Sequence, residues 1–352
     1  MRWSYGCVSA LILISAMAFS VRASVEWSYN GGTPTALPVS TLSVSGTGNV
    51  LRIYSTTGSD AIPAVTLSGS ASTGSSLCII VASTSTSCGG ATTFSGGASF
   101  AGLSFQTGSE ALRDASALTL NVTGNITGDI TVGRITRIMP GGNIITGTTT
   151  TATADDDGST RAITLIQPDG SVLGSIIATN GSIGELRSTA GNIGPTTGNT
   201  RPTVHGHHIG TIQANNINAD IVATGTLARL NATDGSVNGS VSVAGKFALD
   251  PFGEADPELS LIDATEESTA RIEAGSIVGS IHVNGMHNEN GTAGIICSDF
   301  FGNITSTGRI DVLQFSSFNC DSSGRWHRDR ATEIGSVISV FPRSPDPTLS
   351  PR

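Results

Sequence analysis

Charged side chains are scarce in this sequence of 352 residues, because Asp, Glu, Lys and Arg together make up only 13% of it. That is about half of the usual fraction. Lys246 is the single lysine, and the formal net charge is −9. Phosphates are neutralised by clustered Lys and Arg, so the sequence argues against nucleic acid as a partner. Aromatic residues are 5% of the chain, and aliphatic side chains therefore have to form the core.

Catalytic signatures are also missing. The sequence has no Gly-x-Ser-x-Gly nucleophile elbow, no phosphate-binding loop and no dinucleotide fingerprint, which are the short motifs that mark common enzyme classes. We therefore expect no catalytic residue and no cofactor, apart from the calcium site considered below.

Long apolar segments are limited to the start of the chain. Arg2 is followed by an apolar run of 12 residues from Val8 to Phe19, and small residues for cleavage are supplied by Val21 and Ala23 or by Ala16 and Ala18. This run is short for a bilayer span and has the order of a secretory signal peptide, with a membrane anchor as the alternative. We expect residues 1–23 to be removed, the mature chain to have no membrane span, and the protein to be secreted, periplasmic or at the cell surface.

Cysteine is also rare, with five residues in the whole chain. Removal of residues 1–23 leaves Cys78, Cys88, Cys297 and Cys320, an even number that suggests two disulfides in an exported protein. Three pairings are possible, and we favour Cys78–Cys88 and Cys297–Cys320. The second pair is separated by about one repeat, and equivalent residues on adjacent coils lie about 4.8 Å apart, within reach of a disulfide.

A repeated phrase is what the sequence does contain. Gly is followed by Ser, Thr or Asn, then by Ile, Val or Leu, with a second aliphatic residue three or four positions later, at 124–130, 170–176, 181–186, 225–230, 235–241 and 275–281. Alternation places the aliphatic residues of 125–132 on one face, with Gly128 on the same inward face. Aliphatic residues three apart, such as Ile183 and Leu186, suggest a corner between them. Units that cannot bury their own apolar face must stack on one another.

The domain organisation follows from where this phrase occurs. We expect an all-β solenoid with about 20–23 residues per coil over 118–341, after an irregular N-terminal β region or cap over 24–117. A short helical turn is expected between Gly108 and Leu118. The last residues, 342–352, hold four prolines and are predicted to be a disordered tail. Interruptions at 139–161, 195–208 and 246–269 are expected to be loops on one working face.

The phrase resembles the coils of bacterial right-handed parallel β-helix proteins, which occur as surface adhesins, autotransporter passengers and polysaccharide-degrading enzymes. The resemblance covers roughly residues 118–340 and depends on repeat rhythm. It implies a right-handed parallel β-helix, and no catalytic residue is carried over from it.

Two clusters could hold a metal ion. Asp155, Asp156 and Asp157 offer hard oxygen ligands for calcium, although a solvated acidic loop is the simpler interpretation. His205, His207 and His208 could coordinate a transition metal. Three ligands within four residues seldom close a tetrahedral site, so we interpret this segment as a polar loop.

The densest acidic segment lies between residues 250 and 267. If the protein is an enzyme, Asp250, Asp256 and Glu258 are the candidate catalytic carboxylates of a polysaccharide lyase or glycoside hydrolase, with Lys246, Arg229 or Arg271 as a basic group nearby. The simpler interpretation is an exposed loop that charge keeps soluble.

Low charge and the export signal favour a structural or adhesive protein that acts through an extended surface. The expected partners are cell-surface glycans or other surface proteins. Seven Asn-x-Ser/Thr sequons start at Asn121, Asn125, Asn180, Asn231, Asn238, Asn290 and Asn303. Stacking of asparagines at coil turns is a simpler explanation for them than glycosylation.

Overall fold

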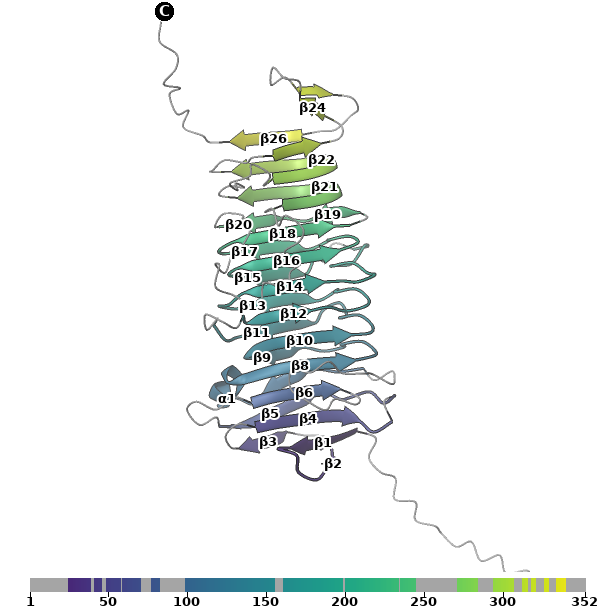
Figure 1. Ribbon diagram of the computed structural model, residues 1–352, viewed down its shortest axis with the longest axis vertical. Helices are drawn as coiled ribbons and strands as arrows, with labels where there is room; N and C mark the ends of the chain where they lie inside the picture. The colour runs from purple at the N-terminus through teal and green to yellow at the C-terminus, as the bar shows by residue number, and fades with distance from the viewer. Residues whose placement is uncertain are drawn as a thin grey trace, which may run out of the picture.

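The computed structural model is a tall stack of β-strands, with the N-terminal strands at one end and the C-terminal strands at the other (Figure 1). It describes residues 25–38, 41–45, 49–57, 59–70, 77–82, 99–155, 161–198, 200–233, 235–244, 271–283, 294–306, 312–315, 318–320, 326–328 and 334–339. The predicted signal peptide at 1–23 and the predicted tail at 342–352 lie outside these residues.

Three parallel ladders run along the stack, and we name them A, B and C. Ladder A consists of β4 (Asn49–Ser55), β6 (Leu77–Ala82), β8 (Ser116–Val122), β10 (Arg134–Pro140), β12 (Ile163–Ile166), β14 (Ile183–Arg187), β16 (Ile209–Ala214), β18 (Leu227–Ala232), the first residues of β21 (Arg271–Val283) and of β22 (Gly294–Ser306), and β23 (Val312–Phe315).

Ladder B is the second. It consists of β3 (Leu42–Ser45), β5 (Val65–Ser70), β7 (Leu103–Phe105), β9 (Ile130–Val132), β11 (Thr149–Ala152), β13 (Ser175–Ala178), β15 (Thr203–Gly206), β17 (Asp220–Ala223), β20 (Val241–Val243), the last residues of β21 and β22, and β26 (Ile334–Ser339).

Ladder C is narrow. Single bridges connect Ile62, Phe100, Ile126, Ile144, Val172, Ile193, Ile217 and Val237, and β19 (Ser236–Asn238) pairs with the middle of β21. Each coil passes through ladder A, then C, then B. The predicted all-β parallel solenoid is thereby confirmed.

Alternation along each short strand fills the interior with aliphatic side chains. In one coil Leu118, Ile126 and Ile130 belong to ladders A, C and B, and all three are fully buried. Equivalent residues of successive coils are direct register partners, so Ile135 lies on Leu118 and Ile144 on Ile126. One continuous aliphatic core therefore runs the length of the stack.

A chain of polar side chains follows the corner between ladders A and C. The Asn125 Oδ1 accepts the backbone N–H of Asn143 at 2.7 Å, and the Asn143 Oδ1 accepts that of Ser171 at 2.6 Å. In the same way, the backbone N–H of Asn192 donates to the Ser171 Oγ, and that of Asn216 donates to the Asn192 Oδ1. Each polar residue precedes an inward aliphatic residue, so its side chain satisfies a backbone donor of the next coil.

The residues joined by these bonds give the number of residues in each coil. Successive residues of this corner are separated by 18, 28, 21, 24 and 20 positions. The expected coil of 20–23 residues is therefore found in some turns and not in others. The longer coils are those with a connecting loop, and the ladders keep their register through them.

The glycine that opens the repeated phrase is required by a close approach. A Cβ on Gly170 would collide with the Asn143 Oδ1, the atom that accepts the bond from the next coil. Gly128 shows the predicted inward approach, because a Cβ there would collide with the carbonyl oxygen of Ala101 in the neighbouring coil. These two positions therefore require glycine, because adjacent coils lie too close together there for a Cβ.

Two sequence-based expectations on local structure are wrong. Ile183 and Leu186 lie within the single strand β14 and are both buried, so no corner lies between them. Strict alternation would separate two inward residues by two positions, and Gly184 is the additional residue between Ile183 and Leu186. A Cβ on Gly184 would contact the Thr164 carbonyl oxygen. The stretch 139–161 is not a simple insertion either, because it contains the inward Ile144 and strand β11.

Of the other two predicted interruptions, 195–208 contains a loop followed by β15. The third, 246–269, lies outside the described residues. The described loop before β15 connects ladder C to ladder B, whereas residues 153–162 connect ladder B to ladder A. These two connections therefore belong to different corners of the coil, and the expected single working face is not formed by them.

The N-terminal region continues the ladders. Strand β6 pairs in parallel with β8, and β8 with β10, so pairing has no break at residue 117. Below β6, β4 is covered on its outer edge by β1 (Val25–Tyr29), which is antiparallel to it and to β2 (Thr35–Ala36). An antiparallel strand at the first coil satisfies an edge that would otherwise be open.

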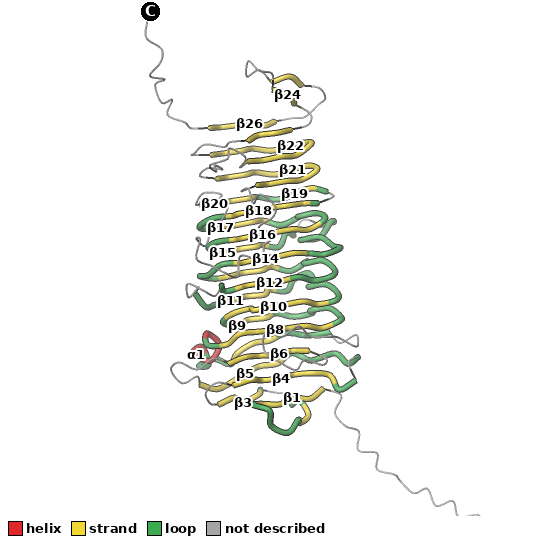
Figure 2. The backbone as a smooth tube through the Cα atoms, in the orientation of Figure 1, coloured by secondary structure: helices red, strands yellow, loops and turns green. Residues whose placement is uncertain are grey.

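The expected helical turn is α1 (Glu110–Asp114), which lies beside the lower strands of the stack (Figure 2). The Asp114 Oδ1 accepts bonds from the Arg113 Nε at 2.9 Å and from the Thr153 Oγ1 at 2.8 Å. Partial burial raises the pKa of Asp114, but these two bonds outweigh it and leave the pKa below its ordinary value.

At the C-terminal end of the stack, β24 (Phe318–Cys320) and β25 (Trp326–Arg328) form an antiparallel pair.

Candidate binding surface

The outer face of ladder B carries no formal charge along its central column. Register pairing aligns Thr66, Ser104, Thr131, Thr151, Ile177, His205, Val222, Ser242, His282 and Thr305. These residues alternate with the buried ones, so they point outward. The column is therefore a line of hydroxyl, imidazole and small aliphatic groups with a rise of about 4.8 Å per coil.

Acidic residues at the edge of this face are engaged in the stack. The Asp129 Oδ1 accepts the backbone N–H of Thr149 at 2.7 Å. The Asp220 Oδ1 accepts both the N–H and the hydroxyl of Ser240, each at 2.9 Å. Both carboxylates satisfy donors of the following coil.

The outer face of ladder A is different, because charged side chains lie there among polar and aliphatic ones. One column aligns Thr119, Arg137, Leu165, Glu185, Thr211 and Arg229. Arg187 lies 3.6 Å from Glu185 and donates to the Gln213 Oε1 at 2.9 Å. Charge is thus placed in the outward column of ladder A and is absent from the central column of ladder B.

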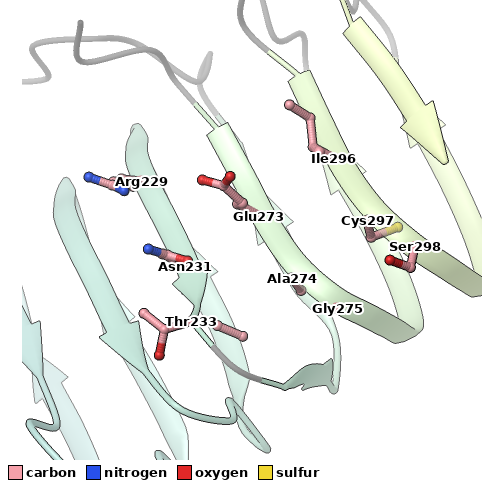
Figure 3. A pocket seen from close by; sticks show the side chains of 10 residues that line it. Arg229, Asn231, Thr233, Glu273, Ala274, Gly275, Ile296, Cys297 and Ser298 are labelled. Carbon is pink, nitrogen blue, oxygen red and sulfur yellow. The ribbon is translucent and has the colours of Figure 1, made fainter. Parts of the chain in front are cut away.

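A shallow hollow is lined by residues of β18, β21 and β22 and of the turn after β18. It has a volume of about 470 Å³, and Arg229, Asn231, Thr233, Glu273 and Ser298 supply its polar groups. Figure 3 shows these side chains on three successive strands. Arg229 and Arg271 are register partners on neighbouring strands, so two of the basic residues named from the sequence are adjacent.

The predicted calcium ligands are not brought together within the described part of the chain. Asp155 is exposed on the loop after β11, while Asp156 and Asp157 lie outside the described residues. No group of three or more His, Cys, Asp or Glu side chains that could hold a metal ion occurs among the residues that the structure describes. The calcium site stays a prediction.

The carboxylates of the enzyme hypothesis, Asp250, Asp256 and Glu258, also lie outside the described residues. The segment that contains them joins Ala244, after β20, to Arg271, where β21 begins. Their role stays a prediction.

The histidine segment is divided between two settings. His205 points outward on β15, in the central column of ladder B. His207 and His208 lie at the corner that follows, with ring centroids 4.1 Å apart. Their Nδ1 atoms lie 3.0 Å and 2.9 Å from the hydroxyls of Thr224 and Thr226. These imidazoles take part in contacts between coils, which the sequence interpretation of a polar loop did not foresee.

The cysteine predictions lose part of their geometric basis. Cys78 lies on β6, and Cys88 lies outside the described residues, so that pair stays a prediction. Cys297 is buried on β22, and its register partner in the following strand is Phe315. The expectation that Cys320 stacks directly on Cys297 is therefore wrong, because the chain reverses into β24 before Cys320. The disulfide between them stays a prediction.

Several sequon asparagines are structural. Asn125 accepts a bond from the next coil, Asn238 donates to the Asn218 Oδ1 at 2.7 Å, and Asn121 and Asn231 are buried. The expected asparagine stacking is confirmed at the corner that contains Asn125. Asn180 and Asn303 are exposed.

Within the described ranges, no helix has both the length and the apolar character needed to cross a membrane. Comparison with known proteins adds no relative: no family model, no curated protein and no solved structure matches this chain.

Proposed function

We propose that the protein is an exported, non-catalytic solenoid that attaches to cell-surface glycans or other surface proteins through the outer face of ladder B. The observation that carries the proposal is the uncharged central column of that face. Hydroxyl groups offer both donors and acceptors to a ligand. The absence of charge removes the attraction that an anionic polymer would need, so the face suits an uncharged glycan.

A structural or adhesive role, like those of the surface proteins that the repeats resemble, fits this surface. Parallel stacking repeats one row of side chains over many coils, and each row adds a weak contact. Many weak contacts along a stiff surface sum to useful affinity when the ligand is also extended.

The test is co-sedimentation of residues 24–352 with insoluble neutral and acidic polysaccharides. Ile177→Arg places a charge in the central column of ladder B, and Leu165→Arg places the same charge at a matched outward position of ladder A. We expect binding to neutral polymers, weakened about tenfold by Ile177→Arg and unchanged by Leu165→Arg. Equal effects of both variants, or wild-type binding to acidic polymers alone, would contradict the proposal.

The alternative is a polysaccharide lyase or glycoside hydrolase on the same scaffold. The observation in its favour is the hollow at β18, β21 and β22, where Arg229 and Glu273 bring a cation and a carboxylate to one opening. The same polysaccharides, incubated with and without calcium and assayed for new reducing or unsaturated ends, distinguish the two functions. Release of product would favour the enzyme, and alanine at Asp250, Asp256 and Glu258 would then be expected to abolish it.

A further inference from the structure

The corner between ladders B and A contains a second chain of side-chain bonds, and a histidine forms one of its links. Ser182, His208 and Thr226 precede the inward residues at the start of β14, β16 and β18. The His208 N–H donates to the Ser182 Oγ at 3.3 Å, and the Thr226 N–H donates to the His208 Nδ1 at 3.2 Å. His208 therefore does at this corner what Asn143 and Asn192 do at the corner between ladders A and C.

The imidazole is held in the orientation that this bond needs. A Cβ on Gly225 would lie 2.7 Å from both the Nδ1 and the Cε1 of His208, so the ring packs directly against the glycine backbone. The Thr226 hydroxyl lies 2.9 Å from the same Nδ1. An Nδ1 that accepts a backbone N–H carries no proton, so the ring in this arrangement is the neutral tautomer protonated at Nε2.

Histidine differs from asparagine in one respect, because protonation removes its acceptor. A proton on Nδ1 would face the Thr226 N–H, and that backbone donor would lose its partner. The exposed His207 has its ring in contact with that of His208. The adjoining strands carry Glu185 and Arg187 on β14, Arg229 on β18 and His205 on β15, while β16 carries no ionisable side chain. The buried Arg161, which precedes β12 at the same corner, lies against Gly184 of β14.

We propose that His208 is a proton-sensitive link between two coils in the middle of the solenoid. The link is complete while the imidazole is neutral and is lost when Nδ1 binds a proton. The folded arrangement excludes a proton that the unfolded chain accepts, so the stabilisation is fully present above the ordinary imidazole range of about pH 6.5 and falls as the pH drops below it. Acid then loosens the corner that directly follows β15 and the binding face that β15 helps to form.

The experiment is hydrogen exchange at the Thr226 amide of the full chain, resolved to single residues by fragmentation mass spectrometry and corrected for intrinsic exchange. Between pH 7.5 and pH 5.0 we expect the protection factor of the wild type to fall by about tenfold, the equivalent of one backbone hydrogen bond. His208→Asn supplies an oxygen that no proton blocks, as Asn143 does, and should remove this pH dependence. His207→Asn, the matched control on the neighbouring ring, should retain most of it.

Three outcomes of the exchange experiment would overturn the proposal. They are a wild-type protection factor that does not change with pH, a pH dependence that persists in His208→Asn, and a pH dependence that disappears in His207→Asn alone. Nitrogen chemical shifts of labelled histidine in the wild type provide a test that does not depend on how the variants fold. The Nε2-protonated tautomer is expected for His208 at pH 7.5, and the Nδ1-protonated tautomer would also overturn the proposal.

Discussion

Three residue types with separate tasks make up the repeated phrase. Gly170 leaves space for the Asn143 side chain of the preceding coil, Ser171 passes a hydrogen bond to the next coil through its hydroxyl, and Val172 fills the core. Each task depends on atoms in a neighbouring coil about 4.8 Å away. The phrase is therefore a record of contacts between coils more than of local conformation.

A buried threonine interrupts the aliphatic stack of ladder B. Thr150 is fully buried between Ile130 and Ile176, and its hydroxyl has no hydrogen-bond partner within the described structure. Thr150→Val removes an unsatisfied polar group without changing the volume, so we expect stabilisation by about 1 kcal/mol. Chemical denaturation measures it, with the outward Thr151→Val as the control that should change little. Destabilisation by Thr150→Val would show that the hydroxyl is bonded.

At the scale of the strand, alternation decides which residues are inside. Ile281 is 1% exposed and pairs with Val241 below and Ile304 above, while the next residue, His282, is exposed. This burial places Ile281, the second aliphatic residue of the phrase at 275–281, inside the stack. It also shows that the last residues of β21 belong to the same stack as β20 and β22.

Replacement of Ile281 tests the energy of that stack. Ile281→Asp removes buried methyl groups and buries an unpaired charge, so we expect a loss of about 3–5 kcal/mol in the free energy of unfolding. His282→Asp introduces the same carboxylate one position along and should change stability by less than about 0.5 kcal/mol. Equilibrium unfolding in urea measures both. Similar losses for the two variants would contradict the register.

At the scale of the whole molecule, the two ends of the stack differ from its middle. The backbone donors and acceptors of a terminal coil stay unpaired unless a capping strand covers them. Strand β1 covers β4 through five register pairs, from Val25–Ser55 to Tyr29–Leu51. The Asn30 Oδ1 also accepts the N–H of Val50 at 3.0 Å. The first coil is thus closed by an antiparallel strand that further parallel coils cannot continue.

Removal of this cap should change the association state. Deletion of residues 25–36 exposes the backbone donors and acceptors of β4, and we expect concentration-dependent oligomers that join through this edge. Light scattering after size-exclusion chromatography measures their mass, with a chain that begins at residue 25 as the control. A truncated protein that keeps its β-type circular dichroism and stays monomeric at all concentrations would show that β4 is protected in another way.

The sequence alone determined the solenoid, because the aliphatic residue that follows each Gly-polar pair is most simply buried when the repeats stack on one another. It also indicated that Gly128 faces a close neighbour and that asparagines stack at turns. The spacing of Ile183 and Leu186 was misleading. Two inward aliphatic residues lie three positions apart when a corner separates them, and also when a strand contains one extra residue, as β14 does at Gly184. Stretch 139–161 was misread because Thr150 is polar although it points inward.

Only the tertiary structure decided which outward residues share a face. Thr151, Ile177 and His205 are far apart along the chain and become neighbours through the register of ladder B. The uncharged column, the charged column of ladder A and the link between His208 and Thr226 all depend on coil lengths that vary from turn to turn. Side-chain hydrogen bonds between coils hold the register through these variations, and the repeated phrase marks the residues that form them without showing which outward residues they align.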